Sequence, residues 1–347
     1  MLCCFAPIMV AASKNEVNPD GRDFKLMEGL MKRILVTGGA GYLGSHICYL
    51  LARKGYLPVV YDNLSTGYAA NVQWGPLQIG DIRDEKRLKE IVSRHQPAAV
   101  IQVAGQPDGS ADIGEADAFD HRYGDVISLL STLIDLDVTK LVLAGWPTEM
   151  DRLVDEQLAG SVGAMFVRHL LSELDRISGF RSVLLRHLDA AGCKRDHDFE
   201  RGRHSRSNVI GRLADAICGK RPCFRIYGDD LPTTDGTFVG DYLHVMDAAD
   251  AYVRAVDYLL DGGASATLDL GTGEGISTSE LIAAAQRMTG SHFEVVPMAS
   301  TKADPSEIII DPAAARSTLG WAPQRTRRDM LASAFLWSIR SRGAIAA

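Results

Sequence analysis

The sequence lacks the cysteine and histidine spacings that hold structural metal ions. None of its cysteines forms a Cys-x-x-Cys pair, and no histidines stand at the spacing that a zinc site needs. We therefore expect no metal site, and we interpret the cysteines as ordinary thiols of a protein in the reducing cytoplasm. The six cysteines are Cys3, Cys4, Cys48, Cys193, Cys218 and Cys223.

Excess positive charge and long apolar runs are missing as well. The formal net charge is -7, so the overall electrostatic field of the protein does not attract nucleic acid. No apolar run reaches the roughly 18 residues of a membrane span. The 347 residues, 46% of them hydrophobic, suffice for a main domain and a smaller lobe. We expect a cytoplasmic protein with neither a nucleic-acid partner nor a membrane span.

The first 30 residues lack the features of a secretory signal. No basic residue precedes the apolar stretch at Met1–Ala12, which argues against a signal peptide. We expect residues 1–30 to be a disordered extension, because Met31-Lys32-Arg33 leads directly into the first apolar run. A signal peptide and a lipid anchor at Cys3 and Cys4 are the alternatives.

Apolar runs alternate with amphipathic helical stretches over most of the chain. This alternation predicts an α/β fold, a Rossmann-type doubly wound parallel sheet with right-handed crossovers. We expect the sheet domain to span residues 31–190, completed by later segments, and residues 191–347 to form mainly a smaller C-terminal substrate lobe. The predicted strands are Arg33–Thr37, Pro58–Tyr61, Leu77–Ile79, Ala98–Val103, Lys140–Leu143 and Ser182–Arg186, and the predicted helices are Ile47–Lys54, Lys86–His95, Ala118–Leu136 and Val162–Ile177.

A glycine-rich turn follows the first predicted strand. Gly38, Gly41 and Gly44 form a Gly-x-x-Gly-x-x-Gly pattern that leads into an apolar helix. Two of these glycines permit a tight turn and the close approach of the backbone to a pyrophosphate, and the third lets helix and strand pack tightly. We assign them, together with Tyr42 and Leu43, to a dinucleotide site.

Further candidate residues stand at the ends of the next three strands. Asp62 lies about 20 residues beyond the glycine loop, where a carboxylate can accept both hydroxyls of an adenosine ribose and repels a 2'-phosphate. This arrangement favours NAD over NADP, and we expect NAD as the cofactor. The other residues assigned to the cofactor are Asn63, Ser65, Asp81, Ile82, Val103, Ala104 and Gly105.

These motifs and a series of later segments resemble the UDP-glucose 4-epimerase family, within the extended short-chain dehydrogenases/reductases. The resemblance runs in one register from about residue 32 to residue 340, and its most unusual part is a Pro-Thr-x-Asp-Gly-Thr turn. It implies an NAD-binding protein of nucleotide-sugar and galactose metabolism. The segments are Asp62–Gly67, Trp74–Pro76, Tyr227–Thr237, Asp241–Val245, Leu270–Gly273 and Leu319–Trp321.

The proton-handling residues that the resemblance implies are missing. The family uses a tyrosine, a lysine four residues later, and a serine or threonine on the preceding strand to remove the proton of the sugar's 4-hydroxyl group. None of the ten tyrosines has a lysine four residues later. The tyrosine position falls on Gly160 and the lysine position on Ala164, and the preceding strand ends with Ala144-Gly145. We expect no catalytic residue at these positions, and an impaired or silent enzyme.

The residues that the resemblance assigns to the UDP-sugar are also altered. Asp189 replaces an asparagine and places a carboxylate near the expected diphosphate. Two like charges ~4 Å apart repel by about 1 kcal/mol in water. Gly240 and Thr301 replace arginines, whereas Asp304 is retained. We expect Asp189 and Asp304 to contact a substrate that binds weakly, unless basic residues of segment 194–206 replace the arginines.

Two functions from different classes remain open. One is a silent epimerase homologue that binds NAD and acts through association, as a homodimer or as a heteromer with an active relative. The other is an active UDP-sugar 4-epimerase, or a related sugar-nucleotide oxidoreductase, with relocated catalytic groups. The resemblance implies dimerisation through the helices predicted at Ala118–Leu136 and Val162–Ile177.

Overall fold

The main sheet contains seven strands, all parallel, and the computed structural model describes residues 31–103, 124–145, 160–194, 209–298 and 306–343. The strands are β1 (Arg33–Thr37), β2 (Leu57–Asp62), β3 (Leu77–Ile79), β4 (Ala99–Gln102), β5 (Lys140–Gly145), β6 (Arg181–Arg186) and β11 (Ala266–Asp269). Their order across the sheet is β3-β2-β1-β4-β5-β6-β11. The order reverses between β1 and β4, which is the point where doubly wound sheets bind their ligands, beyond the carboxyl ends of the strands.

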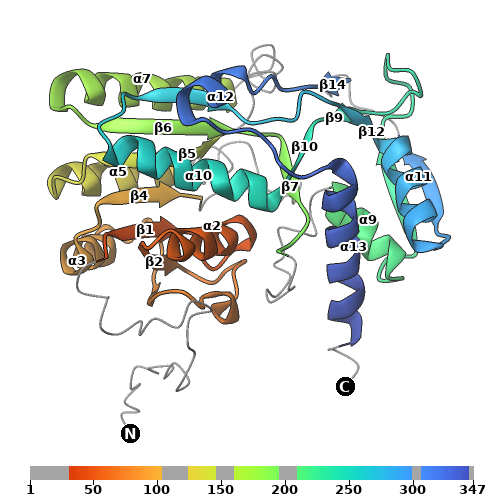
Figure 1. The fold of residues 1–347 in the computed structure, drawn as a ribbon, viewed down its shortest axis with the longest axis horizontal. Coiled ribbons are helices and arrows are strands. Elements are labelled where there is room, and N and C mark those ends of the chain that lie inside the picture. The colour runs from red at the N-terminus through yellow and green to blue at the C-terminus, as the bar shows by residue number, and fades with distance from the viewer. Residues whose placement is uncertain (1–30, 104–123, 146–159, 195–208, 299–305, 344–347) are drawn as a thin grey trace, which may run out of the picture.

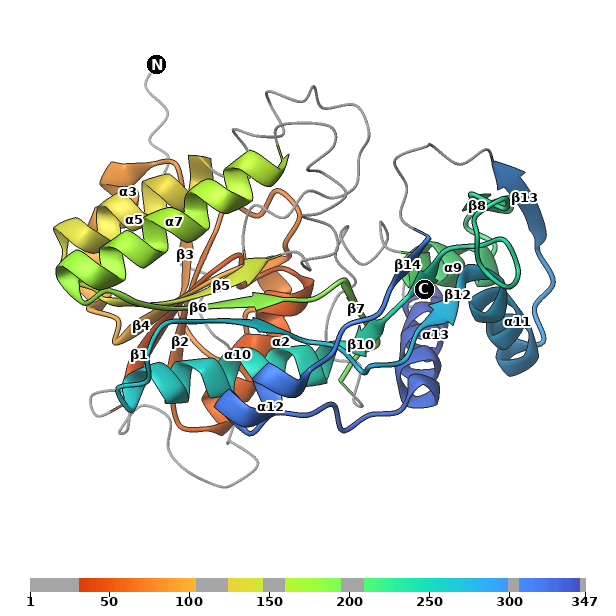
Figure 2. The same ribbon diagram turned by 90° about the horizontal axis from the view of Figure 1, so that it is seen from above.

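Helices cover both faces of this sheet (Figures 1 and 2). One face carries α3 (Glu85–His95), α5 (Asp125–Asp135) and α7 (Gly160–Ser178). The opposite face carries α2 (Tyr42–Arg53), α10 (Val245–Leu260) and α12 (Ala313–Leu319). The predicted doubly wound α/β fold is therefore confirmed, and segments beyond residue 240 complete it.

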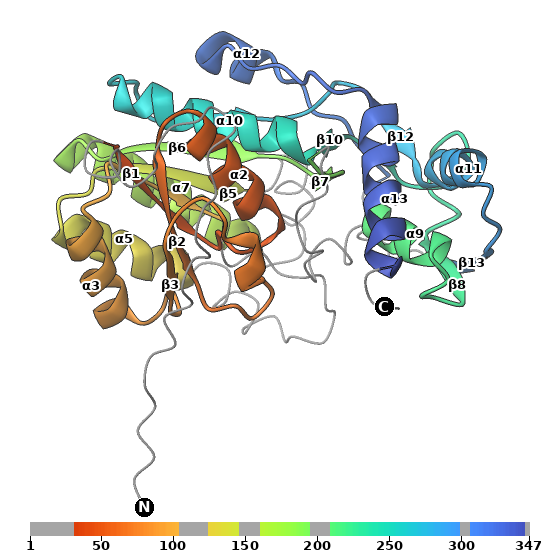
Figure 3. The same ribbon diagram turned by 60° about the horizontal axis from the view of Figure 1, so that its bottom comes forward.

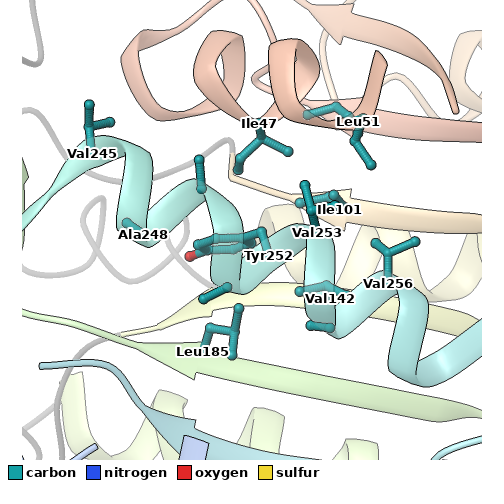
Figure 4. Close-up of a cluster of buried hydrophobic side chains, with 14 of the residues drawn as sticks. Ile47, Leu51, Ile101, Val142, Leu185, Val245, Ala248, Tyr252, Val253 and Val256 are labelled. Carbon is teal, nitrogen blue, oxygen red and sulfur yellow. The ribbon is translucent and has the colours of Figure 1, made fainter. Parts of the chain in front are cut away.

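The α10 face holds a continuous apolar core. In Figure 4, Tyr252 and Val253 of α10 lie between Ile47 of α2 and the strand residues Val142 and Leu185. All five side chains are at most 1% exposed. Burying an aliphatic or aromatic side chain of this size contributes about 1.5–3 kcal/mol, so α10 is a principal stabilising element of the sheet although it follows β6 by some 60 residues in sequence.

A smaller lobe stands beside the sheet (Figures 2 and 3). Its helices are α9 (Val209–Ile217), α11 (Thr278–Thr289) and α13 (Arg327–Gly343), which enclose a separate apolar cluster. Its strands pair as β8 (Cys223–Tyr227) with β13 (Glu294–Met298), and as β12 (Ile276–Ser277) with β9 (Val239–Gly240) and β14 (Glu307–Ile308). The pair β7 (Asp189–Ala191) and β10 (Tyr242–His244) lies between the sheet and the lobe. Among the described residues, no helix has the length and hydropathy to cross a membrane.

The starts of α2 and α7 differ from the predicted starts by two residues or more, and α3 begins one residue early, at Glu85. Helix α2 begins at Tyr42 rather than Ile47, because the backbone of Gly41 is extended and serves as the N-cap. Helix α7 begins at Gly160, two residues before the predicted start. Of the helix predicted at Ala118–Leu136, the part from Asp125 onward is confirmed, and residues 118–123 lie outside the described residues.

Candidate functional site

The glycine-rich loop connects β1 to α2 at the carboxyl edge of the sheet. Gly38 has a φ of 75°, in the left-handed region that favours glycine, and its N–H donates to the carbonyl of Tyr61 at 2.9 Å. A Cβ on Gly44 would lie 2.2 Å from the Gly38 carbonyl oxygen. Gly41 carries no side chain that could cap the helix, and the N-terminus of a helix favours a bound anion.

Asp62 ends β2 and holds this loop from the side. One carboxylate oxygen accepts the N–H of Ala40 at 3.0 Å, and the other accepts the N–H of Leu64 at 2.8 Å. Burial raises the pKa of the Asp62 carboxyl, and the two backbone hydrogen bonds lower it. The residue predicted to bind ribose therefore also fixes the position of the glycine loop.

The other cofactor candidates at this edge lie close together. The Asn63 side chain donates to Asp81 at 2.9 Å and accepts the N–H of Ser65 at 3.0 Å. Ile82 is 7% exposed and packs into the core on the α3 face. The N–H of Val103 donates to the carbonyl of Thr37 at 3.1 Å, directly beside the glycine loop. Ala104 and Gly105 lie outside the described residues.

The positions predicted to have lost the proton-handling groups lie on β5 and α7. Strand β5 ends in Ala144 and Gly145, and a Cβ on Gly145 would lie 2.9 Å from a methyl group of Leu184. Gly160 is the first residue of α7, and Ala164 follows one turn later. Neither a glycine nor an alanine side chain can accept or donate a proton.

The substrate candidates lie at the junction of sheet and lobe. Asp189, in β7, is paired in register with Tyr242 of β10. A Cβ on Gly240 would lie 2.8 Å from the Tyr242 phenol and 2.9 Å from the Leu188 side chain, so these two side chains fill the space beside it. Asp304 lies outside the described residues, as do Thr301 and segment 195–206.

Asp241 has a structural role that sequence reasoning missed. Its buried carboxylate accepts N–H bonds from Thr272 at 2.9 Å, Gly273 at 2.9 Å and Ile310 at 3.3 Å, and the Thr272 hydroxyl at 2.6 Å. Three separate chain segments therefore meet on one carboxylate. Because the acceptor of buried backbone N–H groups is costly to remove, the loss of this carboxylate should destabilise all three segments.

A hydrogen-bonded network, here called the α2–α13 junction, joins the start of α2 to α13 of the lobe. The Tyr42 hydroxyl donates to the carbonyl of Gly192 at 2.5 Å, and the Tyr42 ring stacks on Trp337 with centroids 5.7 Å apart. His46 Nδ1 donates to the carbonyl of Tyr42 at 2.8 Å, and His46 Nε2 accepts the N–H of Lys194 at 3.4 Å. The assigned tautomer of His46 is therefore neutral, with its proton on Nδ1.

A second buried histidine completes the α2–α13 junction. His244 Nδ1 accepts the N–H of Met246 at 3.1 Å, so its proton lies on Nε2, which faces the Ser333 hydroxyl at 3.2 Å. The same hydroxyl accepts the N–H of Cys193 at 3.2 Å. Both histidines are held neutral between the glycine-loop helix and the lobe.

Within the described ranges, no group of three or more histidine, cysteine or carboxylate residues is placed to hold a metal ion. The carboxylates at the candidate site are instead engaged with backbone N–H groups, as Asp62 and Asp241 show.

We expect Asp62→Asn to lower NAD affinity by about tenfold or more. The amide turns an N–H donor toward one of two backbone donors, and a lost hydrogen bond to a charged group costs about 1.5–3 kcal/mol. Removing the charge should also narrow the preference for NAD over NADP. Calorimetric titration with both cofactors measures the effect, with Asp135→Asn, at an exposed ion pair, as control. Unchanged affinities for both cofactors would contradict the assignment.

Comparisons with known proteins agree on one family. Residues 34–146 match the model of the NAD dependent epimerase/dehydratase family, and residues 193–334 match that of GDP-mannose 4,6 dehydratase. A UDP-glucose 4-epimerase from Rhizobium meliloti (strain 1021) is 37% identical over 318 residues, which cover 88% of this chain and 97% of the relative. The chain belongs to the UDP-glucose 4-epimerase-like NAD-dependent epimerase/dehydratase family.

Solved structures of this epimerase family share the fold. UDP-glucose 4-epimerase from Brucella ovis in complex with NAD has 32% identity and a TM-score of 0.79, covering 89% of this chain and 98% of its own. The enzyme from Stenotrophomonas maltophila, with bound NAD and formylated UDP-arabinopyranose, has 29% identity and a TM-score of 0.81, covering 91% and 100%. The family resemblance inferred from sequence motifs is thereby confirmed.

Proposed function

We propose that this chain is an NAD-binding member of the UDP-glucose 4-epimerase family whose epimerase chemistry is impaired or silent. The observation that carries the proposal is a contrast between two edges of one site. The glycine loop and Asp62 keep a geometry suited to a dinucleotide, whereas β5 and α7 present Ala144, Gly145 and Gly160.

The residues present fit NAD. The absence of a side chain at Gly41 and the N-terminus of α2 suit a pyrophosphate, and the Asp62 carboxylate suits an adenosine ribose. When bound, NAD supplies a hydride acceptor. The chain's own residues would hold and orient the cofactor, but no phenol at position 160 removes the substrate's proton, which is the step that general-base catalysis accelerates by about 10²–10⁴-fold.

The test begins with the small molecules that remain bound after purification. We expect mass spectrometry to detect NAD, and an assay of UDP-galactose and UDP-glucose interconversion to give no rate above that of Gly41→Ala. NAD bound together with a clear epimerase rate would remove the silent assignment and establish the alternative, an active UDP-sugar 4-epimerase or sugar-nucleotide oxidoreductase with relocated groups. The similarity to a UDP-glucose 4-epimerase, at 37% identity over 97% of that relative's length, supports the alternative.

The same proposal includes association, as a homodimer or as a heteromer with an active relative, in the cytoplasm. Helices α5 and α7 lie side by side (Figure 2). Five of their large apolar side chains are exposed. They are Ile127, Ile134, Met165, Phe166 and Ile177. A face of this kind on two adjacent helices suits packing against the equivalent pair of a second subunit into a four-helix bundle.

We expect Phe166→Glu to convert the dimer to a monomer. Phe166 is 51% exposed on α7, and a buried, unpaired carboxylate at a helix interface is strongly unfavourable. Size-exclusion chromatography with light scattering measures the mass. The matched control is Leu336→Glu on α13, an apolar residue 49% exposed, which should leave the mass unchanged. If the control dissociates the dimer and Phe166→Glu does not, the interface lies on the lobe instead.

A further inference from the structure

Helix α2 begins without the groups that usually stabilise a helix N-terminus. Its N-cap, Gly41, has no side chain, and its first turn contains no acidic residue. A capping oxygen contributes about 0.5–2 kcal/mol to a helix, and a carboxylate in the first turn about 0.3–1 kcal/mol. Either group would also compete with an anion bound at the same N-terminus or repel it. The first turn of α2 must therefore be held by contacts of another kind.

The side chain of Tyr42, the first residue of α2, makes those contacts with the lobe. Its hydroxyl donates to the carbonyl of Gly192 at 2.5 Å, and its ring stacks on that of Trp337 at an interplanar angle of 17°. Both aromatic side chains are buried. An aromatic pair contributes about 0.5–1.5 kcal/mol beyond the burial of its area.

Trp337 differs in its packing from the apolar residues that precede it on α13. Met330, Leu331 and Phe335 belong to the apolar cluster of the lobe, whereas Trp337 belongs with Tyr42 to the cluster of the main sheet. Trp337 therefore extends from the lobe into the core beneath the glycine loop.

The same face of α13 also fixes the carbonyl that Tyr42 binds. Ser333 precedes Trp337 by four residues, so the two side chains lie on one face of the helix. The Ser333 hydroxyl accepts the N–H of Cys193 at 3.2 Å. Gly192 has a φ of 94°, and a Cβ at this position would lie 2.7 Å from the Ser333 oxygen. Helix α13 thus holds both the ring partner and the hydrogen-bond partner of Tyr42.

We propose that Trp337 is a positioning residue for NAD, which fixes the N-terminus of α2 by holding Tyr42 and so replaces the missing cap. The inference rests on the NAD binding of the proposed function, and it deepens that function because it makes the cofactor site depend on the lobe. Loss of the Trp337 ring leaves the glycine loop unchanged in sequence but frees the first turn of α2 to move away from the pyrophosphate position.

The test is calorimetric titration of exhaustively dialysed protein with NAD. We expect Trp337→Leu to lower NAD affinity by about tenfold, and Trp337→Phe, which retains an aromatic ring, to recover most of the loss. Phe335→Leu is the matched control. Phe335 is 2% exposed on the same helix but packs into the lobe, so this variant should lose stability and keep its NAD affinity. Circular dichroism confirms that each variant is folded at the temperature of the titration.

A double-mutant cycle with Tyr42→Leu distinguishes positioning from general damage to the lobe. If Trp337 acts through Tyr42, Trp337→Leu should lower NAD affinity by less than about twofold when Tyr42 is already leucine, whereas independent effects would multiply. Two outcomes would overturn the proposal when the unaltered chain binds NAD: unchanged affinity in Trp337→Leu, or losses that multiply fully in the double variant. Both leave the cofactor assignment standing. An equal loss in Phe335→Leu would also overturn it, and an unaltered chain that binds no NAD would reject the cofactor assignment together with this inference.

Discussion

Gly44→Ala is expected to destabilise the chain by about 3 kcal/mol or more and to abolish NAD binding. The added Cβ would lie 2.2 Å from the Gly38 carbonyl oxygen and 2.7 Å from the Gly39 Cα. Both atoms belong to the backbone of the loop, so no side chain can rotate to relieve the contact, and overpacking of this kind is among the larger single-residue effects. Urea unfolding followed by circular dichroism measures the stability, and calorimetry measures NAD affinity.

Gly41→Ala provides the matched control for that experiment. Its Cβ would meet one neighbour, the Gly38 carbonyl oxygen at 3.1 Å, and its extended backbone suits any residue. We expect stability within about 1 kcal/mol of the unaltered chain but reduced NAD affinity, because the methyl group faces the pyrophosphate. Equal losses of stability in the two variants would contradict the assignment of Gly44 to packing and of Gly41 to the approach of NAD.

Acid is expected to destabilise the chain steeply through the two histidines of the α2–α13 junction. Burial lowers the pKa of His46 to about 4 and that of His244 to about 3, from an ordinary value of 6.5. As pH falls below 6.5, the unfolded chain binds a proton on each histidine and the folded chain binds neither, so the free energy of unfolding falls. The contribution of His46 stops changing below about pH 4, and that of His244 below about pH 3. Two protons give a slope of about 2.7 kcal/mol per pH unit.

The slope identifies the residues responsible. Urea unfolding between pH 7 and pH 4.5 should show the slope reduced by about half in His46→Gln and nearly absent in His46→Gln with His244→Gln. Glutamine retains both a donor and an acceptor for the hydrogen bonds of the α2–α13 junction. His169→Gln, an exposed residue of α7, is the control. A double variant as acid-sensitive as the unaltered chain would assign the effect to other groups.

The strands of the sheet were largely predictable because buried parallel strands are short apolar runs. Six of the seven were predicted at their observed places, for example Arg33–Thr37, whose last four residues are buried. Strand β11 was not, since its sequence, Ala-Thr-Leu-Asp, is short and half polar. This strand is recognised by its contact with β6. Arg186 of β6 forms a bidentate ion pair with Asp269 of β11, with both N–O distances 2.8 Å, although the two residues are 83 positions apart in sequence.

The candidate site was predictable only where local chemistry dictates it. Gly44 and Asp62 follow from spacing along one strand-turn-helix unit. The contact of Arg212 with Tyr227 depends on how α9 packs on β8, and the stacking of Tyr42 on Trp337 depends on α13, which lies nearly 300 residues away. Periodicity within a segment carries no information about such contacts, which tertiary packing alone creates.

The late position of β11 also bears on how the protein is made. Ribosomal synthesis proceeds from the N-terminus, so β1 to β6 emerge while the strand that borders β6 is still some 80 residues away. During that interval the nascent sheet presents the backbone edge of β6, and lacks the α10 cover over β5 and β6. Sheet and lobe therefore cannot mature one after the other, because α9, β8 and β9 of the lobe are made before the sheet can close its own edge, and α11 and α13 are made after it.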